Sequence, residues 1–271
     1  MKPIDERLQL VFLGSSGCIP VPAFFCSCPN CTAARSDPAL RRTRASLLVQ
    51  GKESVLIDAS PDLASQLERE RIERLDRIFI THWHTDHVAG LPELAEPSAL
   101  CRWPPLDVYV PAAVSHRFDR ELAFLKPRLN VHAVVPGDVI ALPDAHWEVV
   151  KTDHTEHSVG FIVRAGRTVA YLVDGVVPPA ATLDRLQGCD LLVTEATLDE
   201  LDAVGWKNFS VGQATDFWQQ TGAPECVLTH CSCHSWQKGR LVPGWSEQER
   251  AAFERGHAGL RFARDGMRVG V

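Results

Sequence analysis

The sequence has no apolar run of about 18 residues, the minimum length for a helix that crosses a membrane. It has no excess of positive charge either, because 34 acidic residues outnumber 28 basic ones and the formal net charge is −6. A protein with a negative net charge does not attract nucleic acid nonspecifically. No apolar stretch of signal-peptide length follows the polar residues 1–7. We therefore expect a cytoplasmic protein with neither a membrane nor a nucleic acid as partner.

Low-complexity segments and short repeats are also absent, which argues against a repeat architecture. With 271 residues and 45% hydrophobic content, the chain is long enough for one large core, and we expect a single domain over residues 1–271. Strands and helices alternate in both halves, which favours an α+β protein of two αβ halves stacked sheet on sheet. The apolar patterns predict strands at 8–13, 46–49, 54–57, 77–80, 107–110, 147–151, 159–163, 169–173, 191–193, 227–228 and 267–271, and helices at 62–71, 113–124, 179–186, 211–221 and 247–254.

Four polar side chains follow the predicted strand 77–80 directly. His82, His84, Asp86 and His87 lie within six residues of one another. Alternation along an extended chain places the first two on the same side, and a turn returns the other two to the same region. Imidazole and carboxylate suit zinc, manganese or iron. The motif therefore predicts a metal centre.

Further ligands are expected at the ends of other predicted strands. His154, Asp174 and His230 each follow such a strand. If Asp174 bridges two metals about 3.5–4 Å apart, the remaining ligands divide into two sets. The first set is His82, His84 and His154, and the second is Asp86, His87 and His230.

These motifs resemble the metallo-β-lactamase superfamily, whose signature is His-x-His-x-Asp-His. The resemblance covers nearly the whole chain and implies an αββα sandwich with all seven of these residues as metal ligands. It favours His154 over His157, because His154 precedes Gly160-Phe161 as the family's later histidine does. It also implies that Asp58, after the strand 54–57, supports the metal loop.

The cysteines suggest a second metal site. Cys26, Cys28 and Cys31 lie within six residues, and disulfides are rare in the cytoplasm. Structural zinc normally has four ligands, so one is missing. The candidates for it lie just after the last histidine ligand, at Cys231, Cys233 and His234. Three other cysteines, expected to be buried and inert, are Cys101, Cys189 and Cys226.

The cysteine-rich loop resembles one branch of the superfamily, the phosphoribosyl cyclic phosphate phosphodiesterases (PhnP), and is related to a loop in the PQQ biosynthesis protein B. The resemblance favours Cys233 as the fourth zinc ligand, with His234 as the alternative. One position departs from the branch. A histidine that contacts the substrate phosphate is usual before a late helix, and Phe209 occupies that position here, with Lys207, Asn208 and Ser210 beside it.

The resemblance implies a metal-dependent phosphodiesterase that opens a small cyclic phosphate such as phosphoribosyl 1,2-cyclic phosphate. We expect two catalytic divalent metals, manganese or zinc, with a hydroxide between them that Asp86 helps to orient. We also expect one structural zinc and a small phosphorylated substrate. The protein is expected to be a monomer or a homodimer. The alternatives are a thioester or lactone hydrolase on the same scaffold, an accessory protein similar to the PQQ protein B, and a zinc-storage protein.

Two further features belong to the surroundings of the site. Glu195 follows the predicted strand 191–193 and is expected to support the metal ligands from behind. Four arginines form a basic run, which we interpret as a solvated surface; they are Arg35, Arg41, Arg42 and Arg44.

Overall fold

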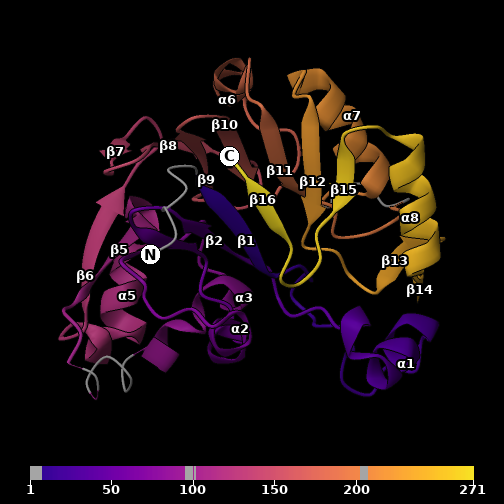
Figure 1. Cartoon of the computed structure of the whole chain (residues 1–271), viewed down its shortest axis with the longest axis horizontal. Helices are drawn as coiled ribbons and strands as arrows, with labels where there is room; N and C mark the ends of the chain where they lie inside the picture. The colour runs from indigo at the N-terminus through magenta and orange to yellow at the C-terminus, as the bar shows by residue number, and fades with distance from the viewer. Residues whose placement is uncertain (1–7, 95–99, 101, 202–206) are drawn as a thin grey trace, which may run out of the picture.

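The computed structural model describes residues 8–94, 100, 102–201 and 207–271. Two seven-stranded sheets face each other in the described chain (Figure 1). The first sheet contains β1 (Gln9–Gly14), β2 (Ser46–Gln50), β3 (Ser54–Ile57), β4 (Arg77–Phe79), β5 (Leu106–Pro111), β6 (Leu129–Val134) and β16 (Arg268–Gly270). Its strand order is β16-β1-β2-β3-β4-β5-β6, with parallel pairing from β3 to β6.

The second sheet repeats this plan with later residues. It contains β7 (Val139–Ala141), β8 (His146–Lys151), β9 (Val159–Arg164), β10 (Thr168–Leu172), β11 (Leu191–Glu195), β12 (Glu225–Thr229) and β15 (Leu260–Phe262), in the order β15-β12-β11-β10-β9-β8-β7. A small antiparallel hairpin of β13 (His234–Gln237) and β14 (Arg240–Pro243) stands apart from both sheets.

The main core lies between the two sheets and joins them through aromatic rings. Phe79 of β4 stacks on Tyr109 at 4.5 Å and on Trp147 of the opposite sheet at 4.7 Å between ring centroids. Phe161 meets the same ring edge-on at 5.2 Å. Because Phe79 precedes the histidine motif by only three residues, this packing fixes the strand end from which the motif starts.

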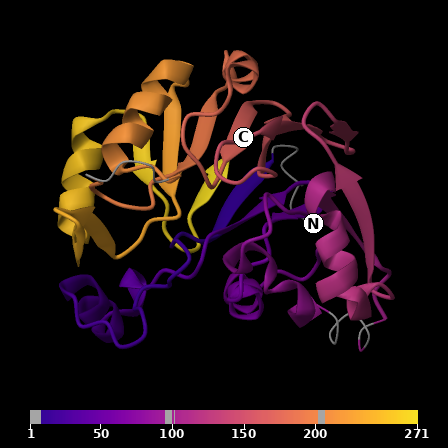
Figure 2. The ribbon, with the colours of Figure 1, turned by 180° about the vertical axis from the view of Figure 1, so that it is seen from behind.

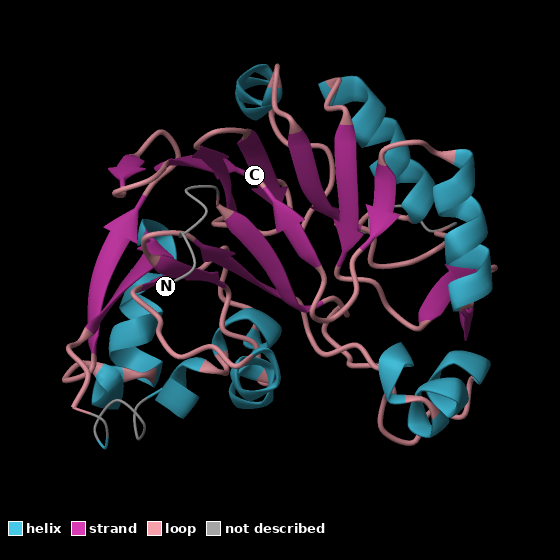
Figure 3. Ribbon diagram, viewed as in Figure 1, coloured by secondary structure: helices cyan, strands magenta, loops and turns pink. Residues whose placement is uncertain are grey.

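Helices cover the outer face of each sheet, as Figure 3 shows in cyan. The helices on the first sheet are α2 (Leu63–Glu70), α3 (Thr85–Val88) and α5 (Ser115–Glu121); those on the second include α6 (Ala180–Leu186), α7 (Val211–Thr221) and α8 (Glu247–Gly256). Separate apolar clusters fill each helix–sheet layer. The predicted αββα sandwich is therefore confirmed. None of the helices among the described residues is both long and apolar enough to cross a membrane.

The chain does not divide into two independent halves, because its last strand returns to the first sheet. β16 pairs with β1 in antiparallel register, and the Val271 amide donates to the Leu8 carbonyl at 2.8 Å. The short helix α1 (Pro29–Ser36) lies beside β13 and α8, more than 190 residues later, in both Figure 1 and Figure 2. Asn30 fixes this contact by donating to the carbonyls of Gly244 and Trp245 at 3.0 and 3.1 Å.

Most predicted elements are present, and the differences concern short or exposed ones. The sequence patterns missed α1, α3, β6, β7, β13, β14 and β15. The predicted helix 113–124 is instead α5 flanked by two short 3-10 turns, Ala112–Val114 and Ala123–Leu125.

Candidate metal centre

The histidine motif leaves the end of β4 and makes the predicted turn, after which the chain enters α3. Asp58, in the left-handed region with φ 62° directly after β3, anchors this turn from below. Its carboxylate accepts hydrogen bonds from the Thr81 amide at 2.8 Å and from the Thr81 hydroxyl at 2.8 and 3.1 Å. It also lies 2.7 Å from Nδ1 of His87. All three residues are fully buried, so the turn is rigid before any ligand binds.

Two groups of potential ligands converge at this place, and each keeps its donor atoms within 4.8 Å of one another. The first cluster is His82, His84, His154 and Asp174, and the second cluster is Asp86, His87, Asp174 and His230. Asp174 belongs to both. These are the seven residues that the sequence singled out, in the division expected for a shared carboxylate.

In the first cluster, ring nitrogens of three histidines lie close to one another. His82 Nε2 lies 2.9 Å from His84 Nδ1, and His154 Nε2 lies 3.2 Å from the same atom. The other nitrogen of His154 is held by the Lys207 carbonyl at 2.9 Å. Burial lowers the pKa of His82, which keeps the ring neutral as a metal ligand requires. His157, the alternative to His154, instead faces Glu156 at the surface.

In the second cluster, the surroundings of one buried nitrogen atom indicate whether a cation fits there. Nε2 of His87 is buried and has no hydrogen-bond partner among the described residues. It lies 3.3 Å from an Asp86 oxygen and 3.6 Å from an Asp174 oxygen. An unpaired nitrogen facing two carboxylates in a buried site is the donor set that a divalent metal satisfies. The residues therefore fit a metal.

The two carboxylates of this cluster are ionised at neutral pH. Burial by itself would raise the pKa of Asp174, but neighbouring His230 and His87 lower it below its usual range. Burial likewise opposes ionisation of Asp86, and His230 and His87 lower its pKa. Asp86 is thus an acceptor at one face of the cluster, 3.4 Å from His230 Nε2.

Glu195 lies behind the second cluster, as predicted, and is fully buried. One carboxylate oxygen accepts from the Thr197 amide at 2.8 Å and from the Thr197 hydroxyl, and that hydroxyl lies 2.8 Å from His230 Nδ1. Burial and the charge of Asp174 raise the pKa of Glu195 to about 7. Our sequence reasoning did not identify Thr197, although its position two residues after Glu195 at a strand end is a usable signal.

The two clusters differ in their exposure. The four residues of the second cluster are buried, whereas His84 of the first cluster is exposed. Gly17 packs closely against His230, because a Cβ there would lie 3.2 Å from the His230 carbonyl and 3.4 Å from its ring. His84 is therefore the most accessible of the seven residues.

The cysteine cluster brings five donors together from two distant segments. Cys26, Cys28, Cys233 and His234 have donor atoms within 4.8 Å of one another. Cys31 Sγ lies 3.5 Å from Cys233 Sγ. His234 approaches Cys233 Sγ at 3.0 Å and Cys26 Sγ at 3.5 Å. Cys231, the third candidate, points elsewhere, to the Thr229 carbonyl. Both alternatives for the fourth ligand are thus within reach.

Of the cysteines expected to be inert, Cys189 and Cys226 are buried, and Cys101 lies outside the described residues.

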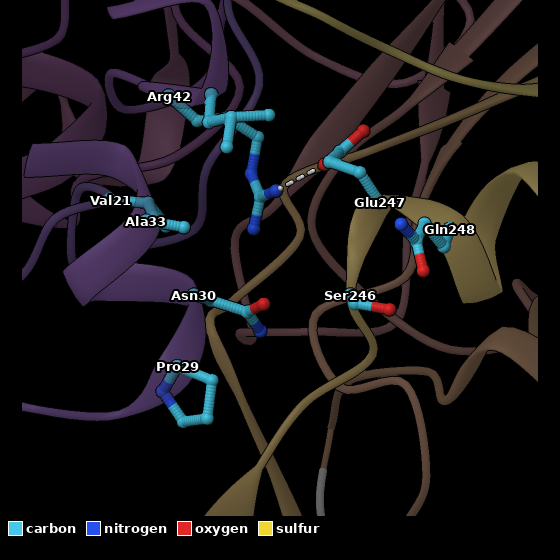
Figure 4. Close-up of a pocket in the computed structure, with 9 residues that line it drawn as sticks. Val21, Pro29, Asn30, Ala33, Arg42, Ser246, Glu247 and Gln248 are labelled. Atoms are coloured by element: carbon cyan, nitrogen blue, oxygen red, sulfur yellow. Dashed lines mark hydrogen bonds and ion pairs between the residues drawn. The ribbon is translucent and has the colours of Figure 1, made fainter. Parts of the chain in front are cut away.

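The interpretation of the arginine run as a solvated surface is wrong for Arg42. This side chain is only 6% exposed. It pairs with Glu247 at 3.1 Å and donates to the Ser232 carbonyl at 3.2 Å. Figure 4 shows the ion pair at the edge of a pocket between α1 and α8, which Asn30 and Ser246 also line. Arg42 therefore joins the segment before β2 to α8 and to the segment after His230, a role that only its distant partners reveal.

Fold and clusters together define a hydrolase of the metallo-β-lactamase fold. The model of the beta-lactamase superfamily domain matches residues 53–231, about two thirds of the chain, and the chain belongs to this superfamily.

Three known proteins place the chain within that superfamily. A diphosphatase of the PhnP family has a crystal structure that superposes with a TM-score of 0.81 and 27% identity, covering 98% of this chain and 97% of that one. The coenzyme PQQ synthesis protein B of Methylobacterium radiotolerans is 30% identical over 70% of this chain and 73% of its own length. The octanoyltransferase of Porphyromonas gingivalis is 28% identical over 84% of this chain, which spans only 46% of that protein. The predicted resemblance to the PhnP branch is confirmed.

Proposed function

We propose that this protein hydrolyses a small phosphorylated substrate, and that the substrate is a phosphodiester such as a cyclic ribose phosphate. One observation carries the proposal: Asp174 offers its oxygens to both clusters. Its Oδ2 lies 3.6 Å from His87 Nε2 of the second cluster and 3.8 Å from His154 Nε2 of the first. A carboxylate between two ligand sets is the arrangement of two-metal sites that cleave phosphate esters.

Two divalent metals, manganese or zinc, bound in these clusters would offset the charge of a phosphate and lower the pKa of water to about 7. The chain's own groups do the rest. Asp86 is ionised, and its carboxylate is placed to orient the attacking water by accepting a hydrogen bond from it. His84 stands at the exposed side, where the substrate enters. Asp58 holds His87 so that its Nε2 faces inward.

A second candidate is hydrolysis of a diphosphate. The PhnP-family diphosphatase, which matches nearly the full length of the chain, supports it. So does the position of Phe209, whose ring is 3% exposed and stacks on Phe217 at 5.5 Å between centroids. The histidine that contacts phosphate in the PhnP branch is therefore replaced by a core residue.

We also propose that the cysteine cluster binds a structural zinc. Thiolates and imidazole in a group of four are the usual ligands of such sites. The predicted set is Cys26, Cys28 and Cys31 with Cys233 as the fourth ligand or His234 as the alternative. The four donors that lie within 4.8 Å of one another are Cys26, Cys28, Cys233 and His234, so this group has His234 where the favoured set has Cys31. Metal analysis of the purified protein should then find about three metals, one of which resists chelation.

The test compares substrates on the purified protein loaded with manganese or zinc. We expect turnover of bis(4-nitrophenyl) phosphate, of a ribose cyclic phosphate or of an organic diphosphate, and none of a thioester or a lactone. His84→Ala should abolish turnover, whereas His157→Ala, a surface histidine outside both clusters, should not. Turnover of the thioester or lactone alone would overturn the proposal in favour of another hydrolase.

A further inference from the structure

The segment 207–209 contacts the metal centre repeatedly, although the proposed reaction assigns it no task. The Lys207 carbonyl lies 2.9 Å from His154 Nδ1. The Phe209 amide donates to Glu195 at 3.0 Å, while its ring turns into the core. The side chain that faces the centre from this segment is therefore Asn208.

Asn208 reaches three oxygens with one amide group. Its Nδ2 lies 3.3 Å from Asp174 Oδ1, 3.0 Å from Glu195 Oε1 and 3.2 Å from Thr197 Oγ1. Asp174 is ionised and accepts, and Glu195 Oε1 already accepts from the amides of Gly175 and Phe209 at 3.2 and 3.0 Å. The Thr197 hydroxyl already donates its single hydrogen to Glu195, so it too accepts from Asn208. The amide nitrogen, rather than the amide oxygen, must therefore face the centre.

The same count of hydrogens applies to His230. Its Nδ1 lies between two acceptors, Thr197 Oγ1 at 2.8 Å and Asp174 Oδ1 at 3.0 Å, and so carries a hydrogen. Its Nε2 lies 3.4 Å from Asp86 Oδ2. A closed ring of contacts joins Asp174, His230, Thr197 and Asn208. Asn208 closes this ring because its Nδ2 contacts both Asp174 Oδ1 and Thr197 Oγ1.

We infer that Asn208 is a positioning residue that holds Asp174 in its bridging orientation and thereby tightens the second cluster. With Oδ1 held on the side of Asn208 and His230, Oδ2 is turned toward His87 at 3.6 Å and His154 at 3.8 Å. The inference deepens the proposed function, because it rests on Asp174 as the shared ligand of two metals. The inference also gives a role to Asn208, which precedes the position of the PhnP-branch histidine: it is a neutral hydrogen-bond donor that binds carboxylates of the protein.

The neutrality of the amide is part of the inference. A carboxylate of the same shape at position 208 would lose both N–H donors and would place a third negative charge beside Asp174 and Glu195. A residue that only fills space would tolerate this isosteric change better than truncation to alanine. A positioning donor should show the reverse order.

The experiment measures catalytic metal content and affinity, alongside turnover, in variants of the full-length protein. Partners that orient metal ligands typically contribute 10–100-fold to metal affinity. We therefore expect Asn208→Ala to bind the second catalytic metal roughly 10–100-fold more weakly, to lose about the same factor in kcat, and to change KM by less than about twofold. Asn208→Asp should lose more than Asn208→Ala, and Asn208→Ser, which keeps one donor, should lose less.

Asn130→Ala is the matched control, because it removes an exposed asparagine that belongs to neither cluster. It should retain wild-type metal affinity. Circular dichroism and the unfolding midpoint identify any variant that fails to fold. If Asn208→Ala fails to fold, the metal affinity of the isosteric Asn208→Asp is compared with that of the wild type. Wild-type metal affinity in both Asn208→Ala and Asn208→Asp would overturn the inference. Absence of phosphate-ester turnover in the wild type would overturn only the proposed function, since metal affinity is measured independently.

Discussion

The His/Asp centre and the cysteine cluster are held in place in different ways. In the centre, the ring nitrogens turned away from the cluster have partners on the scaffold: Asp58 for His87, the Lys207 carbonyl for His154 and Thr197 for His230. In the cysteine cluster, thiols meet backbone amides of their own loop, as where the Cys28 amide approaches Cys26 Sγ at 3.5 Å.

This difference in support indicates two uses of metal-binding residues, one for turnover and one for stability. The centre lies at strand ends that the aromatic core holds in place. The cysteine cluster joins a loop at residues 26–31 to a loop at residues 233–234, and its donors have less support apart from one another. We therefore expect damage to the centre to appear in turnover, and damage to the cysteine cluster to appear in stability.

The largest effect on the His/Asp centre is expected from Asp174→Asn. The change removes one negative charge from both clusters while keeping the side-chain shape. We expect turnover to fall by about a thousandfold, roughly 4 kcal/mol of transition-state stabilisation, with loss of catalytic metal. Turnover of the proposed substrates and metal content measure the effect. Asp153→Asn, which removes an exposed carboxylate paired with the Lys207 ammonium, is the control and should cost far less.

The cysteine cluster should give the opposite result. Cys28→Ser removes one proposed zinc ligand, and a cross-link that closes a loop of this length typically contributes about 2–4 kcal/mol. The unfolding midpoint should fall by roughly 5–15 °C for a chain of this size, while turnover at 25 °C changes less than with Asp174→Asn. Differential scanning calorimetry measures the shift. Thr32→Ala, an exposed neighbour on α1, should leave the midpoint unchanged; equal losses in both variants would contradict a zinc cross-link.

Asp58→Asn tests whether scaffold partners matter as much as the comparison requires. Asparagine tolerates the positive φ at this position, so the backbone is retained and the negative charge is lost. We expect metal affinity to fall roughly 10–100-fold, equivalent to about 1.4–2.7 kcal/mol. A metal titration by calorimetry measures it. If affinity is unchanged, the turn does not rely on Asp58 to orient His87.

The smallest effect is expected at an ion pair that belongs to neither cluster. Burial slightly opposes ionisation of Asp107, but His132, Asn130 and Arg77 lower its pKa below the ordinary value. A carboxyl group whose folded pKa is depressed stabilises above its unfolded pKa of about 3.9, and this stabilisation is lost as pH falls through the folded pKa. Asp107→Asn should therefore cost about 0.5 kcal/mol near pH 5. Urea unfolding should show that difference vanishing as the pH approaches 2; a constant difference would contradict the titration.

The seven centre residues were predictable from the sequence because each follows a strand whose apolar pattern is easy to recognise. His154 and His230 illustrate this, since both come after buried strands of the second sheet. β6 and β7 were missed because they lie at sheet edges and alternate poorly, with β7 exposed at Val139 and Ala141.

Features that depend on distant partners could not be predicted. Arg42 looks like a surface residue until Glu247 and Ser232 are brought to it from about 200 positions away. The roles of Asn208 and Phe209 depend on which of two adjacent side chains turns inward, and sequence spacing alone cannot decide that. The capping box of Ser210 and Gln213 starts α7 and sends Phe209 into the core.

The loop after β12 carries His230 and, three and four residues later, Cys233 and His234, so both clusters are completed by the same short piece of chain. During synthesis at about 5–20 residues per second, His230, Cys233 and His234 are added within about a second of one another. Before then, neither set of ligands is complete. β15 and β16, the edge strands of the two sheets, are synthesised only afterwards, so the ligands of both sites are complete before the strands of either sheet are.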